Sequence, residues 1–140
     1  MSVRFDILTL FPEMIEGMLN QSILKRAIEK KIIEVNIINF RDFSTNKHST
    51  VDDYAYGGGA GMLISVEPIH LAMKTIPNID KAYKILTSPS GNVYNQNKAE
   101  KLSKLDHIVI VCGHYEGIDN RILDYIDEEI SIGDYVLTGG

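Results

Sequence analysis

The stretch "HIVIVCG", residues 107–113, is a short apolar run that ends in a glycine. Its apolar residues are continuous and do not alternate with polar ones, which indicates a strand that is buried on both faces. Strands of this kind belong to parallel sheets, because helices cover both faces of such a sheet. The stretch therefore predicts an α/β domain that is built on a parallel sheet.

Strand-like and helix-like patterns alternate along the rest of the chain. Further strands are expected at residues 3–10, 32–40, 82–88 and 128–133. Helices are expected at residues 12–30, 65–76, 95–105 and 118–126. Ser65 and Asn95 are suited to be N-caps of two of these helices. The alternation predicts a mainly parallel sheet flanked by helices, with right-handed crossovers, while residues 41–62 are expected to form a long loop.

Composition limits the class of protein. The chain has 140 residues, enough for one domain with a buried core. It has no apolar run near the roughly 20 residues of a membrane span and no secretion signal at its start. Cys112 is the only cysteine, which leaves no intramolecular disulfide and no multi-cysteine zinc site. We therefore expect a cytoplasmic protein without membrane attachment.

Charge does not decide whether the partner is a nucleic acid. The chain carries 14 basic and 19 acidic residues, for a net charge of −5. Bulk electrostatic attraction to phosphates is therefore disfavoured. A local basic patch could still hold a nucleic acid.

Turns that contain glycine or proline follow the late strands, where parallel α/β domains bind ligands. These turns are "TSPSG" (87–91), "CGHYEGID" (112–119) and "IGDYVLTGG" (132–140), and "YGGGAGM" (56–62) closes the long loop. Glycine allows close approach of a backbone to a ligand and positive φ angles. One such turn is ordinary, but their combination favours a ligand site.

The glycine cluster at residues 57–61 matches no phosphate-binding motif. It fits neither the G-x-x-x-x-G-K-[ST] loop nor the dinucleotide fingerprint G-x-G-x-x-G. This disfavours a dinucleotide-dependent reductase. A methyltransferase of the open Rossmann-like class is disfavoured as well, because no acidic-x-G-x-G-x-G turn follows the first strand.

The long loop carries side chains that suit contact with a nucleic acid. Its basic residues can contact phosphates, its tyrosines can stack on a base, and its carboxylates can accept from base amino groups. The alternative is a solvated loop whose charges neutralise one another. The spacing of His48 and Asp52 matches no zinc motif, so no metal site is predicted.

Two residues near the end of the fourth strand allow competing interpretations. Cys112 is better explained as a buried residue than as a nucleophile, because no base is evident nearby. Glu116 lies between two glycines, where it would either face a ligand or favour the start of the following helix by its charge.

Four long motifs carry a resemblance to a known family. They are similar, in order, to those of the bacterial tRNA (guanine-N1)-methyltransferases, the TrmD family of the SPOUT class: "RDFSTNKHSTVDDYAYGGGAGM" (41–62), "LTSPSG" (86–91), "CGHYEGIDNR" (112–121) and "SIGDYVLTGG" (131–140). The resemblance implies methyl transfer from S-adenosylmethionine to N1 of the guanine on the 3′ side of the anticodon. It also implies a homodimer, an anticodon loop as partner, and a C-terminal trefoil knot.

The resemblance further implies which residues line the site. The expected cofactor-binding residues are Leu86, Ser88, Pro89, Gly91, Gly113, Tyr115, Glu116, Gly117, Ser131, Ile132, Gly133, Asp134, Tyr135, Val136, Leu137, Gly139 and Gly140. The expected residues on the RNA side are Arg41, His48, Asp52, Gly57, Gly58, Gly59 and Gly61. Bare backbone at the glycine cluster would let the guanine approach the methyl group.

The chain departs from the family in its length. In the family, an aspartate base and an arginine follow the "LTGG" motif, beyond Gly140, so no catalytic residue is assigned here. A magnesium ion assists in the full enzyme, and Glu116 is the matching position nearest to that role. We expect residues 1–140 to form one cofactor-binding domain, without the linker and the helical tRNA-binding domain of the family, with an incomplete knot and no activity alone. From the residues without the resemblance, a non-catalytic nucleotide- or RNA-binding module is an equal alternative.

Overall fold

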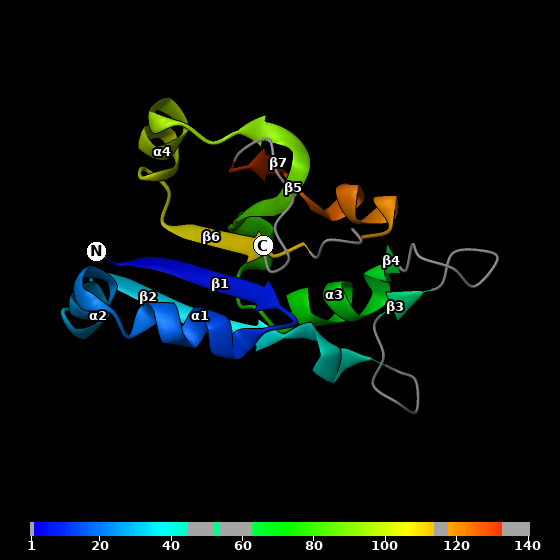
Figure 1. Ribbon diagram of the computed structural model, residues 1–140, viewed down its shortest axis with the longest axis horizontal. Helices are drawn as coiled ribbons and strands as arrows, with labels where there is room; N and C mark the ends of the chain where they lie inside the picture. Colours follow the sequence, from blue (N-terminus) through cyan, green and yellow to red (C-terminus); the bar gives the residue numbers. More distant parts are fainter. Residues whose placement is uncertain (1, 45–51, 54–62, 114–117, 133–140) are drawn as a thin grey trace.

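The chain folds around one parallel sheet, shown in Figure 1. The computed structural model describes residues 2–44, 52–53, 63–113 and 118–132. The five strands are in the order β2-β1-β6-β5-β7, and every neighbouring pair is parallel. They are β1 (Val3–Thr9), β2 (Ile33–Asn39), β5 (Tyr83–Val93), β6 (His107–Val111) and β7 (Glu128–Ser131). The predicted α/β class is confirmed.

Helices cover both faces of the sheet. The α-helices are α1 (Pro12–Leu19), α2 (Ser22–Glu29), α3 (Val66–Met73) and α4 (Gln96–Leu102). Short 3₁₀ helices are η1 (Phe40–Phe43), η2 (Ile79–Lys81) and η3 (Asn120–Tyr125). The chain steps across the sheet in one direction through α1, α2 and α4 and in the opposite direction through α3 and η3. Right-handed crossovers therefore place these two groups on opposite faces.

Two apolar clusters pack on the two faces. On one face Leu8, Val109 and Val111 pack with Ile69 and other buried residues of α3. On the other face Ile85, Ile108 and Ile130 pack with Leu102 and Leu105, at the end of α4 and just beyond it. Neighbouring residues of β6 are thus buried on opposite faces, and the prediction of two-sided burial for residues 107–113 is confirmed. No helix within the described ranges is long and apolar enough to cross a bilayer.

The single helix expected at residues 12–30 is two helices, α1 and α2. The polar residues Asn20 and Gln21 separate them, and Ser22, the first residue of α2, has a positive φ of 25°. Asparagine and serine hydrogen-bond to nearby backbone groups outside a helix and therefore favour helix ends. The apolar spacing alone did not show this break.

Other boundaries differ from the predictions in length or type. The long loop expected at residues 41–62 contains the end of η1, and its described part includes the short strand β3 (Asp52–Asp53), which pairs antiparallel with β4 (Leu63–Ile64). β5 continues five residues past the expected end, to Val93, and the segment before β7 is the 3₁₀ helix η3. Ser65 and Asn95 occupy the expected N-cap positions, and Asn95 Oδ1 accepts from the Lys98 amide at 2.9 Å.

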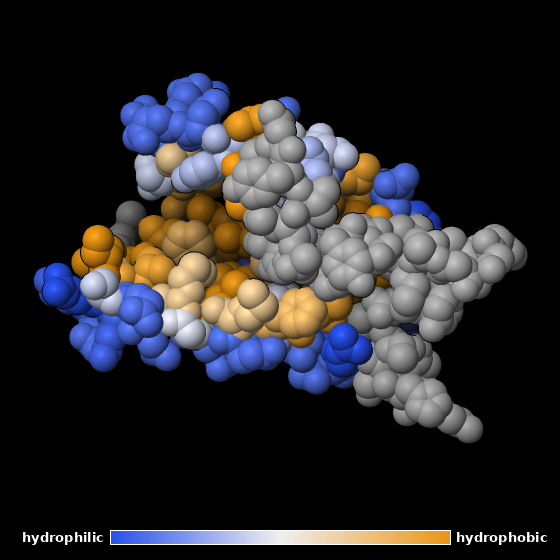
Figure 2. All heavy atoms as spheres, viewed as in Figure 1, coloured by the Kyte–Doolittle hydropathy of each residue, from blue (hydrophilic) through white to orange (hydrophobic). Residues whose placement is uncertain are grey.

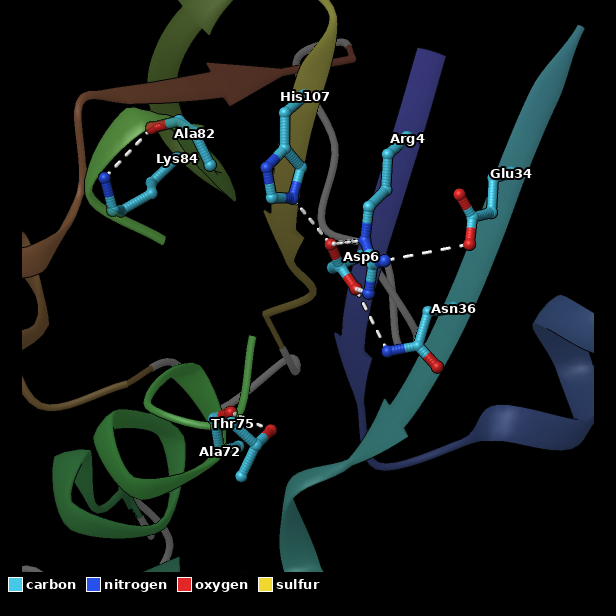
Figure 3. A network of polar contacts seen from close by, with 9 residues as sticks. All are labelled: Arg4, Asp6, Glu34, Asn36, Ala72, Thr75, Ala82, Lys84 and His107. Atoms are coloured by element: carbon cyan, nitrogen blue, oxygen red, sulfur yellow. Dashed lines mark hydrogen bonds and ion pairs between the residues drawn. The ribbon is translucent and has the colours of Figure 1, made fainter. Parts of the chain in front are cut away.

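A buried carboxylate joins three neighbouring strands of the sheet (Figure 3). Asp6, in β1, accepts hydrogen bonds from the guanidinium of Arg4 at 2.9 and 3.0 Å and from the amide of Asn36, in β2, at 3.0 Å. Its other neighbour is His107 Nε2, in β6, at 2.7 Å. Burial disfavours the ionised carboxylate, but these hydrogen bonds outweigh it, so the pKa of Asp6 lies below its ordinary value.

We expect the substitution Asp6→Asn to destabilise the fold by about 2 kcal/mol, because it removes the buried carboxylate that pairs with Arg4 and leaves the guanidinium only the exposed carboxylate of Glu34 at 3.7 Å. Urea unfolding followed by circular dichroism measures this change. The matched control is Asp80→Asn, which alters an exposed aspartate and should change the free energy of unfolding by less than about 0.5 kcal/mol.

The pH dependence tests the same network. An unfolded aspartate has a pKa of about 3.9, and the folded pKa is lower. The stabilisation by ionised Asp6 is therefore fully present above pH 4 and is lost as the pH falls through the folded pKa. The stability difference between the wild type and Asp6→Asn should shrink below pH 4. An equal difference at pH 7 and pH 2 would show that charge at Asp6 is not the cause.

Candidate functional site

The expected cofactor residues with described positions lie within β5, just after β6, and at the end of β7, and these three strands are neighbours in the sheet. β5 lies between β6 and β7, so the carboxyl ends of all three strands meet at one edge. Backbone and side-chain hydrogen bonds join the three segments there. The Gly113 amide donates to Thr87 Oγ1 at 3.0 Å, and the Tyr94 amide donates to the Ser131 carbonyl at 2.7 Å. The structure therefore brings together Leu86, Ser88, Pro89, Gly91, Gly113, Ser131 and Ile132.

The first of these segments is a four-residue excursion within β5. Thr87 and Asn92 are both opposite Ile130 of β7, so residues 88–91 leave the regular ladder between them. Within the excursion, Ser88 Oγ accepts from the Ser90 amide at 3.1 Å. Pro89 and Ser90 are exposed, whereas Leu86, just before, is buried. The excursion thus presents main-chain groups beyond an apolar base.

Two of the predicted glycines are explained by close contact with neighbouring backbone. A methyl group on Gly91 would lie 2.5 Å from the carbonyl carbon of Glu129. A methyl group on Gly113 would lie 2.7 Å from the carbonyl oxygen of Thr87. Both distances are too short for any side chain, so these glycines allow the strand ends to lie close to one another. This requirement does not depend on a ligand.

A polar cluster around Glu128 holds the chain against β7 just after residues 88–91. Glu128 accepts from the Tyr83 hydroxyl at 2.6 Å, from the Asn92 amide at 3.5 Å and from the ammonium of Lys98, in α4. The hydrogen bond to Glu128, together with burial, raises the pKa of Tyr83 to about 12. Tyr83 therefore remains a neutral donor, and the cluster holds α4 and Asn92 against β7.

The described residues of the segments that form this edge carry no charged side chain. Residues 86–91, 111–113 and 130–132 include none of Asp, Glu, Lys, Arg or His. Cys112 is buried, and burial raises the pKa of its thiol to about 11, so it remains protonated. This confirms its interpretation as a structural residue. Among the residues with described positions, no cluster of His, Cys, Asp and Glu could hold a metal ion.

The RNA-side residues are only partly brought to this edge. Arg41 lies in η1, which follows β2, and β1 and β6 separate β2 from β5. Asp52 lies in β3, which pairs with β4. The backbone of Ile64, in β4, forms a bridge with Ile118, and the Asp119 amide donates to the Ile64 carbonyl at 3.0 Å. The chain just after the predicted RNA loop is therefore hydrogen-bonded to Ile118 and Asp119, which follow the predicted cofactor residues 113–117 in sequence.

The remaining predicted residues lie outside the described residues: His48, Gly57, Gly58, Gly59, Gly61, Tyr115, Glu116, Gly117, Gly133, Asp134, Tyr135, Val136, Leu137, Gly139 and Gly140. Their roles and the trefoil knot remain predictions. The sequence does not mark Thr87, Asn92 or Glu128 as links between the strands of this edge. Their contacts depend on which strands are neighbours, and no motif spacing signals that.

We expect Gly91→Ala to destabilise the chain by about 2 kcal/mol, because the added methyl group forces the excursion away from β7. Gly17→Ala is the matched control. A methyl group on Gly17, in helix α1, meets no atom within 4 Å, so alanine should be neutral or stabilise the helix by up to about 1 kcal/mol. Thermal and urea unfolding of both variants measure the difference, and equal stability of the two would contradict the close contact.

Comparison with known proteins places the chain in a family. The family model described as tRNA (Guanine-1)-methyltransferase TrmD matches residues 3–140. A relative from Metamycoplasma arthritidis with the name tRNA (guanine-N(1)-)-methyltransferase is 53% identical over 138 residues, which cover 99% of this chain and 59% of the relative. A relative of the same name from Clostridioides difficile is 55% identical over 142 residues, which cover 99% of this chain and 62% of that protein.

A solved structure agrees with these relatives. The crystal structure of a tRNA (m1G37) methyltransferase from Aquifex aeolicus superposes with a TM-score of 0.88 at 40% identity, over 100% of this chain and 64% of that chain. The chain thus spans less than two thirds of the length of the proteins that it matches. Sequence and fold agree that the chain belongs to the tRNA (guanine-1)-methyltransferase family.

Proposed function

We propose that this chain forms the cofactor-binding part of an S-adenosylmethionine-dependent methyltransferase that acts on N1 of the guanine 3′ of the anticodon in tRNA. Family membership supports the reaction and the substrate class. The observation in this structure that carries the proposal is the set of adjacent ends of β6, β5 and β7, where the motifs shared with the family meet.

The chemistry of this edge fits a cofactor without phosphate groups. Phosphates are bound by basic side chains and helix N-termini, and the described residues of this edge, 86–91, 111–113 and 130–132, include no basic residue. They offer instead the main-chain groups of residues 88–91, the hydroxyl of Ser88 and the apolar side chain of Leu86. Main-chain groups can pair with an adenine and a ribose, and an apolar base can pack on the adenine ring. S-adenosylmethionine has these parts and carries no phosphate.

The proposed role of this chain in the reaction is to bind and orient. S-adenosylmethionine supplies a methyl group that is already electrophilic on its sulfonium, so no nucleophilic side chain is needed. Rigid strand ends hold the cofactor in line with the guanine, which is a contribution of proximity and orientation. A base for the N1 proton and a donor to O6 are also required. The resemblance assigns these to an aspartate and an arginine beyond Gly140. Magnesium assistance in the full enzyme and a cytoplasmic location belong to the same proposal.

We further propose that the chain forms a homodimer, as the resemblance implies. Met14 and Met18, on α1, and Ile23, on α2, are large apolar side chains with at least half of their surface exposed. Figure 2 shows that apolar surface continues from α1 into the hollow between α1 and α4, over β1 and β6. Phe5 and Ile110 lie only half-buried on that face of the sheet. A second copy would remove this surface from water.

Calorimetric titration tests the cofactor. We expect S-adenosylmethionine and S-adenosylhomocysteine to bind, and NAD, which contains a pyrophosphate, not to bind. The titration is done on the 140-residue chain and on a chain extended to the length of its relatives. If S-adenosylmethionine bound neither the 140-residue chain nor the extended chain, the proposal would be overturned. If NAD bound as tightly as S-adenosylmethionine, a general nucleotide-binding module would be favoured.

Methyl transfer tests the reaction. The extended chain is incubated with S-adenosylmethionine and a tRNA transcript, and the nucleosides are analysed by mass spectrometry. We expect N1-methylguanosine from a transcript with guanine 3′ of the anticodon and none from a matched transcript with adenine there. A methyl group on another base or another atom of guanine would contradict the proposed specificity.

Sedimentation velocity tests the homodimer. We expect the wild type to sediment as a dimer and Met18→Lys to shift the equilibrium toward monomer, because it places a charge in an apolar contact. Glu16→Lys places the same side chain two residues away, at another exposed position of α1, and should leave the dimer intact. A monomeric wild type at micromolar concentration would overturn this part of the proposal.

A further inference from the structure

The hydroxyl of Thr87 joins β5 to β6 where their main-chain pairing stops. The register of the two strands ends at Leu86 and Val111. Beyond it, Thr87 Oγ1 accepts a hydrogen bond from the Gly113 amide at 3.0 Å and donates to the Val111 carbonyl at 3.4 Å. A side chain thus supplies the next link of the ladder in place of backbone groups.

Thr87 also lies between the other two segments of the edge. Its backbone pairs with Ile130 of β7, and the excursion at residues 88–91 begins directly after it. Its carbonyl oxygen lies so close to Gly113 that no side chain fits there. One residue therefore determines how far the end of β6 lies from the excursion of β5 and from β7.

We propose that Thr87 is a positioning residue that fixes the spacing between the backbone segments of the cofactor site; this inference rests on the proposed function. Thr87 acts through Gly113 and the β5 excursion and does not react itself. Its only hydroxyl proton is donated to the Val111 carbonyl. The Gly113 amide, at the start of the second segment, depends on Thr87 Oγ1 as its acceptor.

Two substitutions separate the hydroxyl from the shape of the side chain. Thr87→Val keeps the size and β-branching, which suit a strand, but removes both hydrogen bonds. Thr87→Ser keeps the hydroxyl and loses only a methyl group. Because a lost hydrogen bond to a buried group amounts to about a tenfold change in an equilibrium, we expect Thr87→Val to weaken S-adenosylmethionine binding about tenfold. The affinity of Thr87→Ser for S-adenosylmethionine should stay within about threefold of that of the wild type.

The control is Thr75→Val, which removes a hydroxyl that donates to the Ala72 carbonyl at 2.7 Å, at the C-terminal end of α3. The titration is done on whichever form of the wild type binds the cofactor, and melting temperatures are measured in parallel. Thr75→Val should leave the affinity unchanged. Loss of affinity in all three variants in proportion to their melting temperatures would indicate a merely structural role and overturn the inference.

Hydrogen exchange of the Gly113 amide gives a readout that needs no cofactor. Measured by NMR, this amide should exchange at least tenfold faster in Thr87→Val than in the wild type, and serine should restore its protection. A wild type that binds no cofactor overturns the proposed function, and the inference with it. A wild type that binds, with an equal affinity in Thr87→Val, overturns the inference alone.

Discussion

Parallel pairing of β5 with both β6 and β7 is the constraint on which the candidate site depends. Parallel strands end at the same edge of a sheet, so this pairing places three chain segments side by side that are far apart in sequence. Two features stabilise this pairing: the burial of β6 on both faces, and the hydrogen bonds of Glu128, which hold α4 and Asn92 against β7. The segments at the edge are therefore connected to well-packed strands.

Close approach of backbones is the second feature of this edge. Gly91 lies against β7, and Gly113 lies against the carbonyl of Thr87. Motif glycines in a family of enzymes are readily assigned to ligand contact, because bare backbone lets a ligand approach. In this chain, at these two positions, the neighbouring strand already requires the missing side chain. Contact with a cofactor would use main-chain groups that this packing holds in place.

The middle of the sheet and its carboxyl edge differ in their electrostatics. Asp6, in the middle of β1, is buried and hydrogen-bonded to Arg4, Asn36 and His107. The carboxyl edge at β5, β6 and β7 has no charged side chain in its described segments. The ion network contributes to stability.

The sequence alone determined the α/β class, the parallel sheet, the burial of Cys112 and the family. Apolar runs and long ordered motifs are local properties of the chain, so they can be recognised without coordinates. The tertiary structure decided the break at Asn20 and Gln21, the strand order and the excursion at residues 88–91. It also decided the roles of Thr87 and Glu128. Their partners lie 24 to 45 residues away in the chain, and only the order of strands in the sheet brings such distant groups within hydrogen-bonding distance.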